Sequence, residues 1–172
     1  MTLPEQKLRR RVQTCAWIVI IGLIVGGTTA LPLQYELDLL ARMFHAADLS
    51  PAQAPSALVK WILIVRDALH ETYAKYPFIG YGTDWLAFGH FVIAIAFIGV
   101  LRHPLRNAWL FTFGMIACVL VVPFALIAGE ARDIPVGWRF IDCLFGVFGF
   151  IPNWLGYKWT RQLEMMRAVR FD

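Results

Sequence analysis

Three ionisable side chains stand inside otherwise apolar segments of the chain: His90, Arg139 and Asp142. A charged group at the centre of a bilayer costs at least ~2.5 kcal/mol on insertion scales, so each needs a partner or a water-filled cavity. An imidazole exchanges protons near neutral pH, a carboxylate can manage that proton, and a guanidinium can hold an anionic head group. Together these residue types could transfer protons or bind a ligand.

Further acidic residues flank the same segments: Glu36, Asp84, Glu130 and Asp133. His90 follows Asp84 by six residues, which is about 9 Å along a helix. Asp142 lies about as deep in its own segment, so one polar cluster could draw on both helices. The candidates for catalysis are His90, Asp142 and Asp84, and those for ligand binding are Arg139, Glu130 and Glu36.

A purely structural interpretation of these residues stays open. Arg139 and Asp142 are three residues apart on one predicted helix and could neutralise each other. His90 could donate to a carbonyl or carboxylate and fix the register of its helix. In that case the cluster would stabilise the bundle and bind nothing.

A metal site is the weaker alternative. His45 and Asp48, and separately Asp67, His70 and Glu71, have spacings that place them on one helix face. The chain has no HExxH motif, and its three cysteines are isolated, which is typical of packing residues. We assign no metal ligands, and the sequence names no cofactor.

The composition indicates that lipid surrounds most of the chain. Apolar residues make up 59% of the 172 positions and charged residues 16%, and the mean hydropathy is +0.59. A helix needs about 20 mostly apolar residues to cross ~30 Å of hydrocarbon. Four stretches meet this requirement: 14–33, 84–101, 107–129 and 135–157. We therefore expect an all-α, integral membrane four-helix bundle that forms a single domain over residues 1–172.

Positive charge is concentrated on one side of these spans. Ten of the sixteen Lys and Arg residues precede the first span, separate the second from the third, or follow the fourth. By the positive-inside rule both termini are cytoplasmic, which fits a bacterial inner membrane, and segment 34–83 faces outward. Because these cations adjoin apolar spans, nucleic acid is not an expected partner.

The outward segment is predicted to form a helical hairpin. Helical periodicity covers 35–47 and 56–76, and residues 50–55 between them, which include Pro51 and Pro55, break it. Both helices are amphipathic, so the hairpin could lie on the membrane surface or cap the bundle.

Small residues mark the faces that should pack. Gly22 and Gly26 form a small-xxx-small stripe, which suits contact within the chain, with a second copy or with a membrane partner. Spacings of three and four place one set of fourth-span residues on a single face that must point into the bundle: Arg139, Asp142, Gly146, Gly149 and Asn153. The second and third spans offer similar stripes: Thr83, Ala87, His90 and Ala94 on the second, and Gly114, Cys118, Val121 and Ala125 on the third.

Several motifs carry a resemblance to known proteins. The run from Tyr76 to Trp85, the segment Leu126–Gly129 and the segment Trp138–Cys143 resemble a group of uncharacterised small bacterial four-span membrane proteins. The long segment after the first span and the acidic outer helix ends are similar in architecture to the sigma-2 receptor and emopamil-binding sterol isomerase family. That likeness implies a sterol-like or cationic amphiphile as ligand, and it transfers no catalytic residue.

These observations favour a small membrane protein with an outward-facing polar pocket that binds, and could transform, a lipid-like or amphipathic small molecule. One alternative is a structural or accessory subunit of a membrane complex, in which the polar residues only lock helix packing. The other is an oligomeric proton or solute transporter, because an intramembrane His, Asp and Arg could relay protons. Whether the protein is an enzyme stays open.

Overall fold

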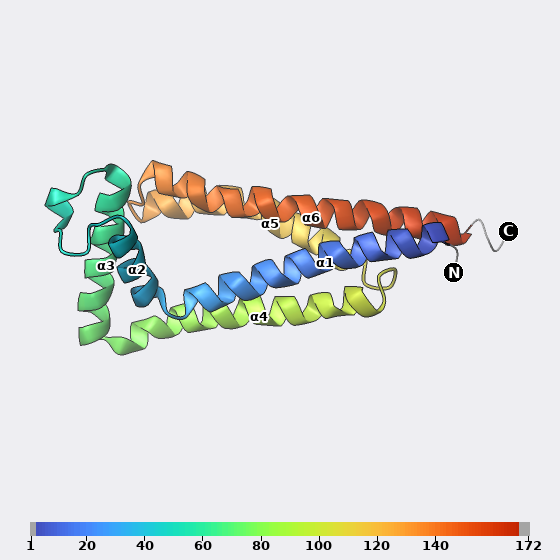
Figure 1. The fold of residues 1–172 in the computed structure, drawn as a ribbon, viewed down its shortest axis with the longest axis horizontal. Helices are drawn as coiled ribbons and strands as arrows, with labels where there is room; N and C mark the ends of the chain where they lie inside the picture. Colours follow the sequence, from blue (N-terminus) through green and yellow to red (C-terminus); the bar gives the residue numbers. More distant parts are fainter. Residues whose placement is uncertain (1–2, 169–172) are drawn as a thin grey trace. The chain divides into compact units, whose positions relative to one another are not determined.

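A computed structural model describes residues 3–168 (Figure 1). Its elements, in chain order, are α1 (Leu3–Ala30), α2 (Leu33–Met43), η1 (Pro51–Gln53), α3 (Ala57–Lys75), η2 (Pro77–Gly80), α4 (Tyr81–Arg102), α5 (Trp109–Ala131) and α6 (Val136–Ala168), where η marks a 3₁₀ helix. No strand occurs within residues 3–168, so the all-α prediction is confirmed.

Four helices are long and apolar enough to cross a membrane, as predicted: Leu3–Ala30, Pro77–Arg102, Trp109–Ala131 and Val136–Ala168. The first and last exceed the predicted spans, because charged but strongly helix-forming residues extend them. The two predicted helices of the outward segment are also present, and Ser56 caps the second by accepting a hydrogen bond from the backbone N–H of Val59 (3.3 Å).

The chain divides into two compact units, which are described separately. Of the described residues, 3–24 and 92–168 form the first unit and 25–91 form the second. The single domain expected from the sequence stays a prediction.

The first unit has an apolar core to which α1, α4 and α5 contribute. Its fully buried side chains include Val12, Phe97 and Phe111. The rings of Phe97 and Phe111 meet edge to face with centroids 6.0 Å apart, an arrangement that adds to the energy of burial. Partly buried residues of α6, including Leu155 and Trp159, pack against the same core.

Within this unit α5 and α6 run side by side and antiparallel (Figure 1). A Cβ added at Gly146 would lie 2.5 Å from the Cys118 carbonyl oxygen, and one at Gly149 would lie 2.9 Å from the Cys118 sulfur. A Cβ at Gly114 would lie 2.2 Å from the Asn153 side-chain oxygen. The predicted faces of the third and fourth spans therefore do pack on each other, through glycines that allow close backbone approach.

The second unit contains the end of α1, the start of α4 and the hairpin of α2 and α3. A Cβ at Gly27 would lie 2.7 Å from the Phe91 ring and 3.1 Å from the Ala87 carbonyl oxygen, so this glycine sets the approach of the two helices. Of the predicted glycine stripe, Gly26 faces His90, whereas nothing lies within 4 Å of a Cβ at Gly22 among the residues that the structure describes. The α2–α3 hairpin has its own small core: Ala41, Ala46, Val59 and Leu63.

Candidate functional site

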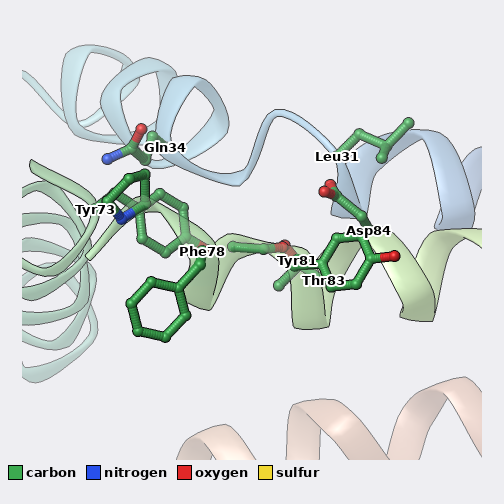
Figure 2. Close-up of a pocket in the computed structure, with 9 residues that line it drawn as sticks. Leu31, Gln34, Tyr73, Phe78, Tyr81, Thr83 and Asp84 are labelled. Carbon is green, nitrogen blue, oxygen red and sulfur yellow. The ribbon is translucent and has the colours of Figure 1, made fainter.

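A hollow of about 600 Å³ lies in the second unit, where α4 begins. Its walls come from the chain after α1, from α2 and α3, and from η2 with the first turn of α4: Leu31, Gln34, Tyr73, Pro77, Phe78, Gly80, Tyr81, Thr83 and Asp84. Figure 2 shows the Asp84 carboxylate directed from α4 toward Leu31, while Tyr81 and Phe78 line the wall further along. The hollow thus combines one carboxylate with three aromatic rings.

Local hydrogen bonds hold these walls in place. The Thr83 hydroxyl donates to the Gly80 carbonyl oxygen at 2.7 Å, which fixes the turn from η2 into α4. The Gln34 amide donates to the Leu69 carbonyl oxygen at 3.3 Å and so ties α2 to α3. Gly80 lets the Tyr73 ring approach closely, because an added Cβ would lie 3.3 Å from that ring.

Asp84 is the one predicted site residue that lines this hollow. It is exposed, and its carboxylate has no hydrogen bond or ion pair with any residue in the described range 3–168. Its acceptor oxygens are therefore free for a ligand that carries N–H or O–H groups.

His90 lies on the same helix but not in the wall of the hollow. Its Nδ1 is 2.8 Å from the Leu86 carbonyl oxygen, which can only accept, so Nδ1 carries the proton that it donates there. In the neutral ring the lone pair is then on Nε2, which a Cβ at Gly26 would approach to 3.6 Å. The predicted donation to a carbonyl is present, and it leaves Nε2 able to accept a proton.

Glu36, the third candidate in this unit, lies on α2 two residues beyond Gln34. It is half-buried, and this burial raises the pKa of its carboxyl because desolvation disfavours the charged form. It does not line the hollow.

Arg139 and Glu130 are brought together at the connection between α5 and α6. The Arg139 guanidinium donates to the Glu130 carboxylate and, at 2.7 Å, to the Ile134 carbonyl oxygen. Its aliphatic stem lies against Gly129, where an added Cβ would come within 2.8 Å. Arg139 therefore pairs with Glu130 and not with Asp142, its neighbour three residues along the helix.

Asp142 has no hydrogen bond or ion pair with any residue of the part of the chain that the structure describes. It belongs, with Glu130 and Arg139, to the first unit, whereas Asp84, His90 and Glu36 belong to the second. The single cluster of six candidates stays a prediction.

Asp133 and His45, which the sequence placed among the candidates, have structural roles at helix ends. Each has a φ of 53° and directly follows the last turn of a helix. Ile134 N–H donates to the Gly129 carbonyl at 2.9 Å, and Ala46 N–H donates to the Ala41 carbonyl at 2.8 Å. Both are Schellman ends, in which the left-handed residue satisfies free helix carbonyls. Asp and His tolerate this conformation better than most residues.

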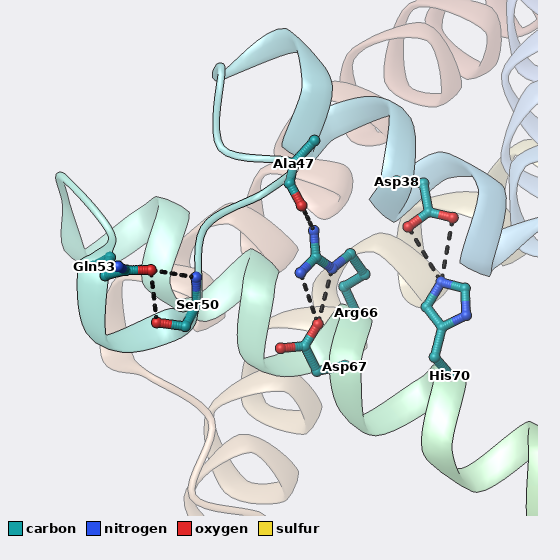
Figure 3. A network of polar contacts seen from close by, with 7 residues as sticks. All are labelled: Asp38, Ala47, Ser50, Gln53, Arg66, Asp67 and His70. Carbon is teal, nitrogen blue, oxygen red and sulfur yellow. Dashed lines mark hydrogen bonds and ion pairs between the residues drawn. The ribbon is translucent and has the colours of Figure 1, made fainter.

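Two further residues of the weaker metal hypothesis, Asp67 and His70, have partners of their own (Figure 3). Asp67 accepts from the Arg66 guanidinium at 2.8 Å, and Arg66 also donates to the Ala47 carbonyl oxygen. His70 lies 3.1 Å from Asp38 across the α2–α3 hairpin. Within residues 3–168 no group of three or more His, Cys, Asp or Glu side chains could hold a metal ion.

Sequence reasoning missed the aromatic wall of the hollow. Tyr73 lies near the end of α3 and Phe78 in η2, where they come next to Tyr81. The aromatic run before the second span was visible in the sequence. Its folding into a wall depends on η2, a single 3₁₀ turn with no periodic pattern of its own.

Four apolar spanning helices place the chain in the class of multi-pass, all-helical membrane proteins. Comparison with protein-family models, with curated proteins and with solved structures found no match.

Proposed function

We propose that this membrane protein binds an amphipathic, lipid-like small molecule in the hollow beside Asp84, which opens on the outer side of the membrane. The observation that carries the proposal is the exposed, unpaired Asp84 carboxylate in a hollow of about 600 Å³ lined by aromatic rings. Ligand pockets are typically concave and largely apolar, with a few polar groups that orient the ligand.

The polar groups of the hollow favour a ligand that donates hydrogen bonds. The Thr83 hydroxyl donates its hydrogen bond to the Gly80 carbonyl, and the Gln34 amide donates one to the Leu69 carbonyl. The side-chain oxygens of both residues therefore remain available as acceptors for a ligand. Asp84 adds a negative charge. An ammonium or hydroxyl group at one end of the ligand would satisfy these acceptors, while its apolar body would cover Leu31, Pro77 and Phe78.

His90 offers a further chemical possibility at greater depth. It lies six residues along α4 from Asp84, and its Nε2 could take a proton from a ligand that extends that far. The proposed function is ligand binding, and proton transfer to His90 would be a second step on the bound ligand.

The test is native mass spectrometry of the purified protein, with extraction and identification of small molecules that co-purify. Asp84→Asn keeps the shape of the side chain and removes its charge, and Phe78→Ala removes part of the aromatic wall. Asp48→Asn is the matched control, because Asp48 is also an exposed carboxylate of the second unit but lies outside the hollow.

We expect a stoichiometric ligand on the wild type and on Asp48→Asn, at least tenfold less on Asp84→Asn, and a smaller loss on Phe78→Ala. Folded wild-type protein that carries no small molecule, or equal occupancy in all four proteins, would refute the proposal.

A structural or accessory role is the second candidate, and the pairing of Arg139 favours it. The hydrogen bonds of its guanidinium stay within the pair of helices α5 and α6 and the turn between them, as expected for a residue that stabilises packing. A partner chain that co-purifies in fixed ratio while the hollow stays empty would support this role.

A further inference from the structure

Basic side chains gather at one end of the first unit, where α1 begins and α4 and α6 end: Lys7, Arg9, Arg10, Arg11, Arg102, Arg106, Lys158 and Arg161. Contacts hold the three helix ends together. Arg9 donates to the Arg102 carbonyl oxygen at 3.4 Å, and the Arg11 guanidinium lies 5.5 Å from the centre of the Trp159 ring. We call this set the basic end.

The carboxylates described at this end are already paired. Glu5 accepts from Arg167 at 2.7 Å, and Glu164 accepts from Arg161 at 2.8 Å. By contrast Lys7, Arg10 and Arg106 are exposed, and their side chains have no acceptor within residues 3–168. The basic end therefore carries an excess of positive charge that the described part of the chain does not neutralise.

The basic end adjoins an apolar surface that begins with tryptophans. Trp17, seven residues or about 10 Å along α1 from Arg10, is 52% exposed, and exposed Ile18 and Ile21 follow it. Trp109 is 61% exposed and follows Arg106 by three residues. Tryptophan prefers the boundary between hydrocarbon and head groups, so cations one or two turns beyond it lie at head-group depth.

We infer that the basic end is a binding site for the phosphate groups of anionic phospholipids. The free guanidinium and ammonium groups would hold the phosphates, and the neighbouring tryptophans and isoleucines would contact the acyl chains. A free phosphate could use only the first of these contacts, so the surface fits a lipid better. This inference does not depend on the hollow beside Asp84.

The test is a titration of delipidated protein in a neutral detergent with phosphatidylglycerol or phosphatidylcholine, followed by native mass spectrometry. The variant Arg10→Gln with Arg106→Gln removes two free cations, and the same positions changed to Lys keep the charge. Arg42→Gln with Lys60→Gln is the matched control, since it removes two exposed cations of the α2–α3 hairpin, which lies in the second unit and outside the basic end.

We expect the wild type to prefer phosphatidylglycerol, and the Gln variant to bind it about 25-fold more weakly, because each basic residue near an anionic surface contributes a factor of about five. The Lys variant and the hairpin control should stay within about threefold of the wild type, and millimolar inorganic phosphate should displace little lipid. Equal binding of the two lipids, or an unchanged Gln variant, would overturn the inference. Full displacement by inorganic phosphate would assign the site to a soluble anion and overturn it as well.

Discussion

At the scale of single residues, Arg139 shows how a charge inside an apolar helix is accommodated. Its guanidinium satisfies both the Glu130 carboxylate and the Ile134 carbonyl, so the positive charge is paired where α5 turns into α6. Arginine suits this role because its fixed fork of donors can serve several acceptors at once.

We expect Arg139→Gln to destabilise the protein by ~1–2 kcal/mol, because the Ile134 carbonyl loses its donor and the arginine stem no longer packs against Gly129. The ion pair itself should contribute little of this, since the Glu130 carboxylate is exposed to solvent. Arg132→Gln is the control, since Arg132 is an exposed cation of the same connection. The measurement is the midpoint of thermal unfolding in detergent. If Arg139→Gln has the same unfolding midpoint as the wild type but no longer retains a bound molecule, Arg139 binds a ligand and does not stabilise the fold.

The partner of Arg139 could not have been deduced from spacing alone. The i, i+3 rule favours Asp142, but the Schellman end at Asp133 turns the chain so that Glu130 comes next to Arg139. Glycine at position 129 then leaves room for the arginine stem. Such a pairing depends on the geometry of one turn, which a residue pattern does not encode.

At the scale of helices, the contact between α5 and α6 depends on a few glycines. The Cys118 carbonyl belongs to the α5 backbone and cannot move aside as a side chain could. A methyl group at Gly146 must therefore push the two helices apart.

We expect Gly146→Ala to destabilise the protein by ~1–3 kcal/mol, the usual range for overpacking a tight interface. Gly137→Ala on the same helix should be neutral or slightly stabilising, because nothing described lies within 4 Å of its added Cβ. The comparison is made by chemical denaturation of both variants in the same detergent. Equal stability of the two would show that α5 and α6 are less tightly packed than the structure indicates.

Helices were the most predictable part of this fold, and helix ends the least. Hydropathy marked the apolar part of each span but stopped short of Leu3 and Ala168, since those helix ends are charged. The bounds of α3, predicted as 56–76, were close because Ser56 is a strong N-cap and residues 50–55 break the helical pattern. The predicted end of α2 at 47 was wrong, since the left-handed residue His45 ends that helix at Met43. Periodicity also placed Gly114, Cys118 and Gly146 on packing faces, but it did not predict that the helices carrying them, α5 and α6, would be the ones to meet.

At the scale of the whole molecule, an even number of membrane spans would place the two ends of the chain on the same side of the membrane. If each of the four candidate helices crosses the membrane once, the two ends and the connection at 103–108 share one side, and the hairpin and the connection at 132–135 share the other. Ten of the sixteen Lys and Arg residues fall on the first of these sides, so by the positive-inside rule we predict that this side faces the cytoplasm.

This orientation predicts which positions a membrane-impermeant maleimide reaches in intact spheroplasts. In a variant with Cys15, Cys118 and Cys143 replaced by alanine, a single Asp48→Cys should be labelled from outside. A single Gln6→Cys or Arg106→Cys should be labelled only after permeabilisation, which also serves as the control for reactivity. Labelling of positions 6 and 106 from outside, with position 48 protected, would reverse the orientation and place the Asp84 hollow on the cytoplasmic side. Labelling of 48 and 106 from the same side would contradict the four-span topology itself, because residues 77–102 separate them.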